Sequence, residues 1–457
     1  MKRIIGFALT LACCVSLFGC GDKAQPQAGS PTTAPTAAST VPTEPPHQHT
    51  FGEWMVKAVS TCTREGREER QCSECKERES RNLPLAEHVQ GATPLCKNCY
   101  YVFTDDNDKV VELGIVCDNW YGSGVMANYV WDIKCWNGKV YRAAGDYDKN
   151  SGATIFLAYD PAETKWKATG SADDEAIHGF VEIGGTLYAA GIDATKGWEY
   201  GNYYVLKEDG LWKQVRNLPN GVHNFDMIEN DGLIFAGLGT EVPGNTVAVS
   251  ADGGKSFTFA PLYKDGKLYD TKGVSYSRTY EFITYKGDVY AMVRFVLNVG
   301  GEWAVFRYED GKMNYMANGL KLFTANVSRK YFGGEFELNG TCYLTAGALT
   351  AVTDFSDPEN WKKIPMPGGE TVIDAFLRDG TVYVLASSIN RKSGKVESYK
   401  TVIYTSTTGQ EGSFTELLSF DYTGSPLCFD YDGSYFYIGT GTNVVKEKMG
   451  MTLRVKP

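Results

Sequence analysis

The stretch EIGGTLYAAG at positions 182–191 sets the pattern from which the rest of the chain can be interpreted. A glycine turn is followed three positions later by an aromatic residue and then by a run of small residues. The pattern returns as ENDGLIFAG at 229–237 and as LRDGTVYVLA at 377–386. Seven glycines carry it, each with a tyrosine or phenylalanine three positions later: Gly138, Gly185, Gly232, Gly287, Gly340, Gly380 and Gly433.

The spacing of these glycines predicts the architecture. Successive glycines lie 47, 47, 55, 53, 40 and 53 residues apart, which is typical of four-stranded propeller blades. The segments around them alternate with period two and are separated by Gly or Asp-Gly turns, which favours antiparallel meanders. We therefore predict an all-β protein whose residues 101–457 form a β-propeller of four-stranded blades, seven in number.

Composition supports strands and excludes one class of partner. The 457 residues include 28 tyrosines, 22 phenylalanines and 50 glycines, which favours strands and tight turns over helices. The formal net charge is −10 and becomes more negative once a leader with Lys2 and Arg3 is removed. Because phosphate backbones are bound by basic faces, we expect no nucleic-acid partner.

The N-terminus indicates export. Residues 1–20 combine a charged start with an apolar segment too short to span a membrane. Leu17-Phe18-Gly19-Cys20 resembles the lipobox of bacterial lipoproteins, which implies acylation of Cys20 and a lipid anchor at the extracellular face of the cell membrane. An ordinary secretory signal is the alternative. Residues 21–47 are rich in Pro and Thr, so we expect a disordered linker that acts as a tether.

Residues 48–100 form a cysteine-rich module. Cys72-Ser-Glu-Cys75 and Cys96-Lys-Asn-Cys99 are two CxxC pairs with the spacing of a zinc ribbon. We take Cys72, Cys75, Cys96 and Cys99 as the first zinc ligand set, with Cys62 and His88 as substitutes. Disulfides are the alternative, because an exported protein meets an oxidising environment.

The module also resembles short cysteine-rich repeats of surface proteins from Gram-positive bacteria. The likeness rests on HTFGEW at 49–54, the single Cys62, the CxxC pair and the later His88. The glycine that such repeats carry after the CxxC is replaced by Lys76 and Tyr100. For this reason the resemblance does not by itself assign the ligands.

Two further resemblances concern the propeller. The turn from Ser250 to Phe257, with Asp252 at its centre, resembles the Asp-box of sialidase-type propellers, in which the aspartate caps the turn. YDPAETKW at 159–166 resembles kelch repeats. Both imply architecture and no chemistry. Outer-strand aromatics are expected to pack between blades: Trp166, Trp212, Phe257, Trp361 and Phe414.

Candidate ligand-binding residues lie where the first strands of the blades begin, because propellers usually bind ligands in the central funnel. These starts carry acids, histidines and aromatics, to which Trp198 is added from a loop after a second strand. Histidines near carboxylates are expected to hold their protons more tightly, so binding should vary between pH 5 and 8. The set is His178, His223, Asp226, Tyr280, Glu281, Glu335, Asp374 and Trp198.

These observations favour a cell-surface lipoprotein whose propeller is a binding platform for an extracellular glycan or peptide. We assign no catalytic residue, because the sequence lacks the opening motif and the arginine arrangement of a sialidase. The alternative function is a carbohydrate-active hydrolase on the same scaffold. A buried acid pair or an arginine cluster in the funnel would favour the hydrolase, and an open aromatic floor would favour binding.

Overall fold

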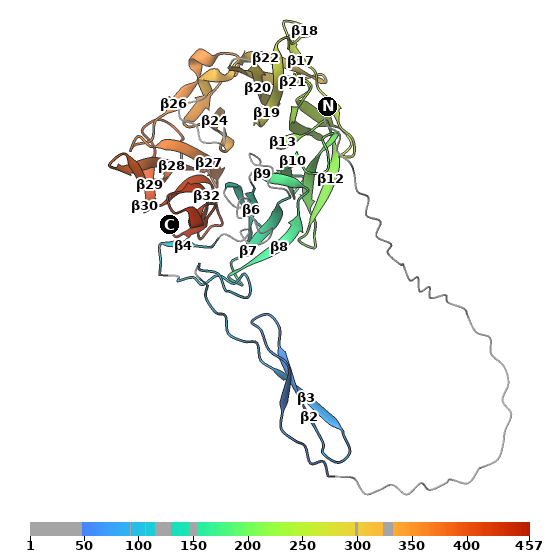
Figure 1. The fold of residues 1–457 in the computed structure, drawn as a ribbon. Helices are drawn as coiled ribbons and strands as arrows, with labels where there is room; N and C mark the ends of the chain where they lie inside the picture. The colour runs from blue at the N-terminus through green and yellow to red at the C-terminus, as the bar shows by residue number, and fades with distance from the viewer. Residues whose placement is uncertain are drawn as a thin grey trace, which may run out of the picture. The chain divides into compact units, whose positions relative to one another are not determined.

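The computed structural model describes residues 48–91, 93–105, 107–114, 129–145, 153–297, 300–322 and 332–457 (Figure 1). The predicted signal peptide, Cys20 and the linker lie outside these residues. The chain divides into two compact units. One unit contains Met1–Met55 and Glu69–Ser80, and the other contains Val56–Glu68 and Arg81–Pro457.

The cysteine-rich module contributes a three-stranded sheet in the order β1-β2-β3. Its strands are β1 (Met55–Ala58), β2 (Gly66–Gln71) and β3 (Arg78–Leu83). Charged residues dominate β2 and β3, and most of the side chains of the three strands are exposed or half-buried. The sheet therefore has little core of its own, which is typical of a module that depends on cross-links or metal.

The described residues of the larger unit form seven antiparallel four-stranded blades, which confirms the predicted all-β propeller. Blades 1 to 3 are β5 (Val130–Trp136), β6 (Lys139–Ala144), β7 (Ile155–Asp160), β8 (Lys165–Ser171); β9 (Asp174–Ile183), β10 (Thr186–Ala194), β11 (Tyr200–Leu206), β12 (Trp212–Pro219); and β13 (His223–Asn230), β14 (Leu233–Thr240), β15 (Val247–Ser250), β16 (Thr258–Phe259).

Blades 4 to 6 are β19 (Val274–Tyr285), β20 (Asp288–Leu297), β21 (Gly301–Glu309), β22 (Lys312–Asn318); β23 (Glu335–Leu338), β24 (Thr341–Thr345), β25 (Leu349–Val352), β26 (Lys362–Ile364); and β27 (Thr371–Arg378), β28 (Thr381–Lys392), β29 (Lys395–Ser406), β30 (Thr415–Tyr422). A short hairpin, β17 (Leu262–Lys264) and β18 (Lys267–Leu268), extends blade 4 through a parallel pairing of β17 with β22. In Figure 1 the blades follow one another around a ring from teal to red.

Blade 7 closes the ring with a strand from the other end of the propeller sequence. It consists of β31 (Gly424–Tyr431), β32 (Phe436–Asn443), β33 (Thr452–Val455) and, outermost, β4 (Val110–Glu112). Strands β33 and β4 are antiparallel, with Leu453 opposite Glu112 and Val455 opposite Val110. A strand that precedes the first blade in the sequence thus completes the last blade, beside β33.

The repeated glycines make the turn between the first and second strands. In blade 1 the central residues Asn137 and Gly138 have φ of 47° and 73°. Positive φ at both central residues defines a type I′ turn, whose twist matches that of the flanking strands. Blade 7 differs, because Tyr431 pairs with Phe436 and the turn between them is longer.

Blades pack through the predicted outer-strand aromatics, all of which are buried. Trp212 of blade 2 stacks on Phe156 of blade 1, with ring centroids 4.5 Å apart. Phe257 of blade 3 lies edge-on to Tyr203 of blade 2, with centroids 6.1 Å apart. Each such contact removes a large apolar surface from water and fixes one blade against its neighbour.

Helical structure is minor among the described residues. It consists of three 3-10 turns, η1 (Gly319–Leu322), η2 (Pro358–Asn360) and η3 (Lys446–Lys448). Within the described ranges we find no helix with the length and apolar character needed to cross a membrane.

Candidate functional site

A cavity of about 250 Å³ lies where the innermost strands of the seven blades converge. We call it the central cavity. Each innermost strand contributes an ionisable side chain, and Lys134 adds a positive charge. Five of the predicted funnel residues meet here: His178, Asp226, Glu281, Glu335 and Asp374. Asp132 and Asp430, which also line the cavity, are not in the set predicted from the sequence.

The aspartates of the central cavity tie neighbouring blades together. Asp132 of blade 1 accepts a hydrogen bond from the backbone N–H of Phe180 in blade 2 at 2.8 Å. Its other oxygen accepts from the N–H of Ile133 at 2.9 Å, beside a bulge in its own strand. The same pair of bonds recurs for Asp226 with Phe282 and Met227, for Asp374 with Phe429 and Ala375, and for Asp430 with Cys135 and Tyr431.

Two carboxyl groups of the central cavity, those of Asp226 and Glu335, resist ionisation. Burial raises the pKa of Asp226, and the nearby Glu335 carboxylate raises it further. Burial also raises the pKa of Glu335, as does Asp374, although a hydrogen bond with Glu281 acts in the opposite direction. Crowded carboxyls in a poorly solvated space favour the neutral form because like charges repel.

A buried group of acids is therefore present, as the hydrolase alternative required, but its geometry suits a structural role. Both oxygens of Asp226 and of Asp374 are occupied by backbone N–H groups. The cavity is also smaller than the roughly 300–1,000 Å³ typical of small-molecule sites. We conclude that these aspartates serve to hold the innermost strands at fixed distances.

A second, larger cavity of about 540 Å³ lies over blades 2, 3 and 4. We call it the blade 2–4 pocket. Pairing of Ile192 with His223 and of Gly239 with Arg278 joins the inner strands of these blades into one continuous sheet. The pocket is lined by Glu175, Asp193, Ala194, Trp198, Val222, His223, Gly239, Thr240, Glu241, Ser275, Tyr276 and Arg278.

Three polar side chains form a row across the pocket, one from each blade. His223 Nδ1 lies 2.9 Å from Asp193 Oδ1, and Arg278 Nη2 lies 3.0 Å from His223 Nε2. An arginine can only donate, so Nε2 is the acceptor and the proton of a neutral imidazole sits on Nδ1, facing Asp193. The row thereby fixes the direction of the Arg278 guanidinium.

The electrostatics of His223 differ from the sequence expectation. Burial lowers its pKa, and the positive charge of Arg278 lowers it further, while Asp193 acts in the opposite direction. The sequence analysis considered only the neighbouring acids and therefore expected a raised pKa. Desolvation and the arginine outweigh the single acid, so His223 is neutral at physiological pH.

Aromatic side chains form part of the pocket lining. Trp198 is 54% exposed, and Arg216 supports its loop by donating to the Gly197 carbonyl at 3.0 Å. The Arg278 guanidinium carbon lies 4.7 Å from the ring centroid of Tyr276. A Cβ at position 239 would come within 2.6 Å of His223 Cδ2, so the close approach of the strands requires glycine there.

The structure thus separates residues that the sequence placed in one funnel. His178 lines the central cavity, with Nδ1 2.9 Å from the Phe225 carbonyl oxygen, whereas His223 and Trp198 line the blade 2–4 pocket. Tyr280 is buried in the core, where its ring lies 4.3 Å from that of Phe225.

The sequence analysis did not name Arg278, although its position in the repeat could have identified it. It precedes its blade glycine, Gly287, by nine residues, as His223 precedes Gly232. The two side chains therefore start neighbouring blades at matching places. Comparison of the repeats position by position would have found the arginine.

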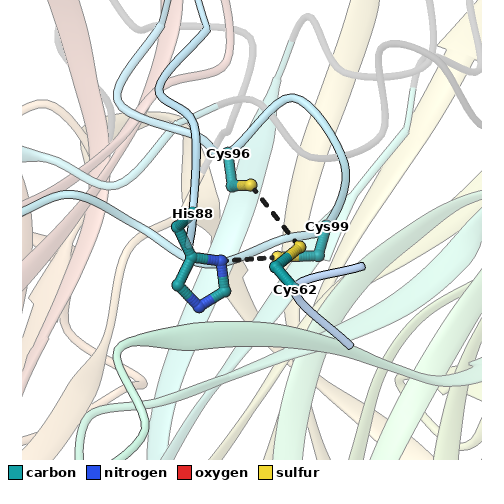
Figure 2. A group of neighbouring side chains, drawn as sticks. All are labelled: Cys62, His88, Cys96 and Cys99. Carbon is teal, nitrogen blue, oxygen red and sulfur yellow. Dashed lines mark hydrogen bonds between the residues drawn. The ribbon is translucent and has the colours of Figure 1, made fainter. Parts of the chain in front are cut away.

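The cysteine-rich module contains a second kind of site. Cys62, His88, Cys96 and Cys99 have ligand atoms that all lie within 4.8 Å of one another. Figure 2 shows Cys96 pointing toward Cys62, with the sulfurs 3.9 Å apart, and His88 Nδ1 3.3 Å from the sulfur of Cys99. Tetrahedral zinc with Zn–S bonds near 2.3 Å separates two sulfurs by about 3.8 Å. The group could therefore hold a metal ion of this kind.

The surroundings of this group hold it against blade 1. Cys96 N–H donates to the Tyr101 carbonyl at 2.9 Å, and Trp166 N–H of β8 donates to the Tyr100 carbonyl at 3.0 Å. His88 stacks on Tyr101 with ring centroids 4.1 Å apart. Burial raises the pKa of Cys96, but the hydrogen bonds from Asn98 and His88 outweigh it and lower the pKa.

The grouping differs from the first predicted ligand set. Cys96 and Cys99 associate with Cys62 and His88, the two residues that the sequence offered as substitutes. Cys72 and Cys75 form a separate group with His49. Spacing along the chain does not reveal this partition, because it depends on how the loops fold back.

Known proteins resemble this chain in structure only. No family model and no curated protein matches its sequence at a significant level. Among solved structures, "YCF48 bound to D1 peptide" has a TM-score of 0.46 at 10% identity, covering 78% of this chain and 99% of that chain. An ulvan lyase of a polysaccharide lyase family has 0.44 at 14% identity, covering 72% and 93%. "Structure of Dos1 propeller" has 0.38 at 10% identity, covering 71% and 78%.

Proposed function

We propose that this protein is an exported, lipid-anchored surface protein whose propeller binds an extracellular glycan in the blade 2–4 pocket. The observation that carries the proposal is the pocket itself. Its volume of about 540 Å³ falls in the range of small-molecule sites, whereas the central cavity is smaller. Anchoring through Cys20 is the part of the proposal that rests on sequence alone.

The lining favours a saccharide over other ligands. Trp198 offers an exposed apolar face, and sugar rings pack their C–H faces on aromatic rings. The three carboxylates of Glu175, Asp193 and Glu241 can accept hydrogen bonds from hydroxyl groups, while Arg278 can only donate. Acids outnumber the arginine, so we propose a neutral or amine-bearing glycan rather than a polyanion.

We further propose that Cys62, His88, Cys96 and Cys99 bind one structural zinc ion. Four protein ligands fill a tetrahedral coordination shell and leave no position for substrate. The ion would cross-link the segment around Cys62 to the knuckle at Cys96–Cys99, which contacts blade 1 through Tyr100 and Trp166.

A glycan array that includes peptidoglycan fragments, probed with the purified protein lacking residues 1–47, tests the binding proposal. For any saccharide that binds, Trp198→Ala should weaken binding at least about tenfold, or ~1.4 kcal/mol. Leu211→Ala is the control, because Leu211 is similarly exposed, at 52%, and does not line the pocket.

Two results would count against the proposal. If Trp198→Ala binds the saccharide as tightly as the wild type, the saccharide binds outside the blade 2–4 pocket. If the protein binds no saccharide on the array, the proposal that its ligand is a glycan is wrong. Release of new reducing ends or of unsaturated products from a bound glycan would instead support the carbohydrate-active alternative.

A further inference from the structure

The second cysteine group begins with a tight knuckle after β2. The Cys72 N–H donates to the Glu77 carbonyl at 2.8 Å and closes the turn around Cys75. Lys76 has φ of 65°, the left-handed conformation that favours glycine. Lysine thus adopts the conformation for which related repeats carry glycine. The turn is held by Gln71 Nε2 donating to the Lys76 carbonyl and by Lys76 Nζ donating to the Ser73 carbonyl, both at 3.0 Å.

The segment before β1 brings a histidine to this knuckle. Ser73 N–H donates to the Thr50 carbonyl at 3.0 Å, and Phe51 forms an antiparallel bridge with Cys72. His49 Nδ1 consequently lies 3.2 Å from Cys75 Sγ. The ligand atoms of His49, Cys72 and Cys75 all lie within 4.8 Å of one another. A sulfur and a nitrogen bound to one tetrahedral zinc are separated by about 3.6 Å, so the spacing fits.

The far side of the histidine ring supplies an independent argument. His49 Nε2 lies 2.8 Å from Glu77 Oε2. A carboxylate at this position holds the proton on Nε2 and leaves the lone pair of Nδ1 directed at the two cysteines. Carboxylate–histidine pairs of this kind are the usual outer support of a metal-bound histidine.

The two cysteine groups differ in ligand number. Among the described residues, three side chains converge at His49, and four converge at His88. Cys72 is buried, whereas His49 and Cys75 are exposed.

We propose that His49, Cys72 and Cys75 form a second zinc site, separate from the four-ligand group. Binding requires the two thiols to lose their protons to solvent and the imidazole to be neutral. No other reactant is needed.

Cobalt(II) titration of the metal-stripped full chain, held reduced, tests the proposal. We expect two equivalents to bind with the intense charge-transfer bands of thiolate coordination. Cys72→Ser/Cys75→Ser and Cys62→Ser/Cys96→Ser/Cys99→Ser should each retain one equivalent.

A milder variant keeps the test valid if the serine variants misfold. Glu77→Gln should weaken zinc affinity by about 10- to 100-fold at one of the two sites, since supporting carboxylates typically contribute that much. Glu79→Gln is the matched control, because Glu79 pairs with Arg70 at 2.6 Å instead of with a ligand. If the wild-type protein binds only one equivalent of cobalt, the second site is refuted. The same holds if Glu77→Gln and Glu79→Gln bind zinc with equal affinities.

Discussion

The Asp226 carboxylate of blade 3 accepts a hydrogen bond of 2.7 Å from the Phe282 backbone N–H of blade 4. This contact explains why an acidic funnel in this propeller is not by itself a ligand site. Desolvated carboxylates that receive backbone N–H groups satisfy strand donors that bulges leave without ladder partners. The ring of acids is part of the architecture.

The acidic ring predicts how stability varies with pH. Burial and Glu335 raise the folded-state pKa of Asp226, so between the unfolded value near 4 and the raised value the folded protein holds more protons. Stability contributed by this group is therefore present at low pH and is lost as pH rises through neutrality. Asp226→Asn should reduce the fall in Tm between pH 5 and pH 8, measured by calorimetry.

Other ionisable groups of the cavity face Asp226, so Asp226→Asn should retain part of the change of Tm with pH. These groups are Asp132, Glu281, Glu335, Asp374, Asp430, His178 and Lys134. Asp379→Asn is the control, because the Asp379 side chain is 95% exposed. If Tm falls equally between pH 5 and pH 8 in Asp226→Asn, in Asp379→Asn and in the wild type, the raised pKa of Asp226 is refuted.

Closure of the ring by β4 makes a second prediction. Leu113 is fully buried; its N–H donates to the Thr452 carbonyl, and its carbonyl accepts from Trp166 Nε1, both at 2.8 Å. Leu113→Ala should reduce the free energy of unfolding by about 2–5 kcal/mol. Leu268→Ala, at a side chain 67% exposed, should leave it nearly unchanged. Denaturant unfolding followed by tryptophan fluorescence measures the stability of both variants. If their unfolding midpoints are equal, the segment that contains β4 and Leu113 does not close the ring.

The anchor remains a prediction from sequence. Acylation of Cys20 requires its thiol, so Cys20→Ser should release the protein into the medium or leave the leader uncleaved. Fractionation of cells followed by immunoblotting detects either outcome. Membrane retention of Cys20→Ser equal to that of the wild type would show that the anchor lies elsewhere.

The repeat was readable from the sequence because a type I′ turn needs positive φ at two residues. Gly138 and the corresponding glycines of blades 2 to 6 follow from that local demand, whereas Gly433 lies in the longer turn of blade 7. Blade number and strand order follow from the spacing of the repeat. Contacts between segments that lie far apart in the sequence have no comparable sequence pattern. The pairing of β4 with β33 and the meeting of Asp193 with Arg278 across three blades depend on ring closure and on blade rotation.

The lining of the blade 2–4 pocket was predicted in part from the same repeat. His223 and Trp198 were named from their places in the repeat, and both line the blade 2–4 pocket. His178 was grouped with His223 because each lies two residues before a phenylalanine. The registers differ, because His178 lies seven residues before its blade glycine, whereas His223 lies nine residues before its own. His178 is the extra residue of the bulge in blade 2, the place that Phe225 occupies in blade 3.

The two histidines should consequently respond differently to substitution. His178→Ala removes the contact with the Phe225 carbonyl and should lower Tm without changing glycan affinity. His223→Ala removes the partner that orients Arg278. Loss of one desolvated polar contact costs ~1–3 kcal/mol, or roughly five- to 150-fold in affinity. Isothermal titration calorimetry with a saccharide identified on the array measures both variants.

The pH dependence of binding separates this account from the sequence expectation. Because burial and Arg278 lower the pKa of His223, the imidazole stays neutral from pH 6.5 to 8 and wild-type affinity should be constant over that range. An affinity that falls steadily as pH rises through neutrality would mean that the bound state needs a charged imidazole. That result would contradict the neutral row Asp193–His223–Arg278, in which His223 Nε2 accepts from the guanidinium.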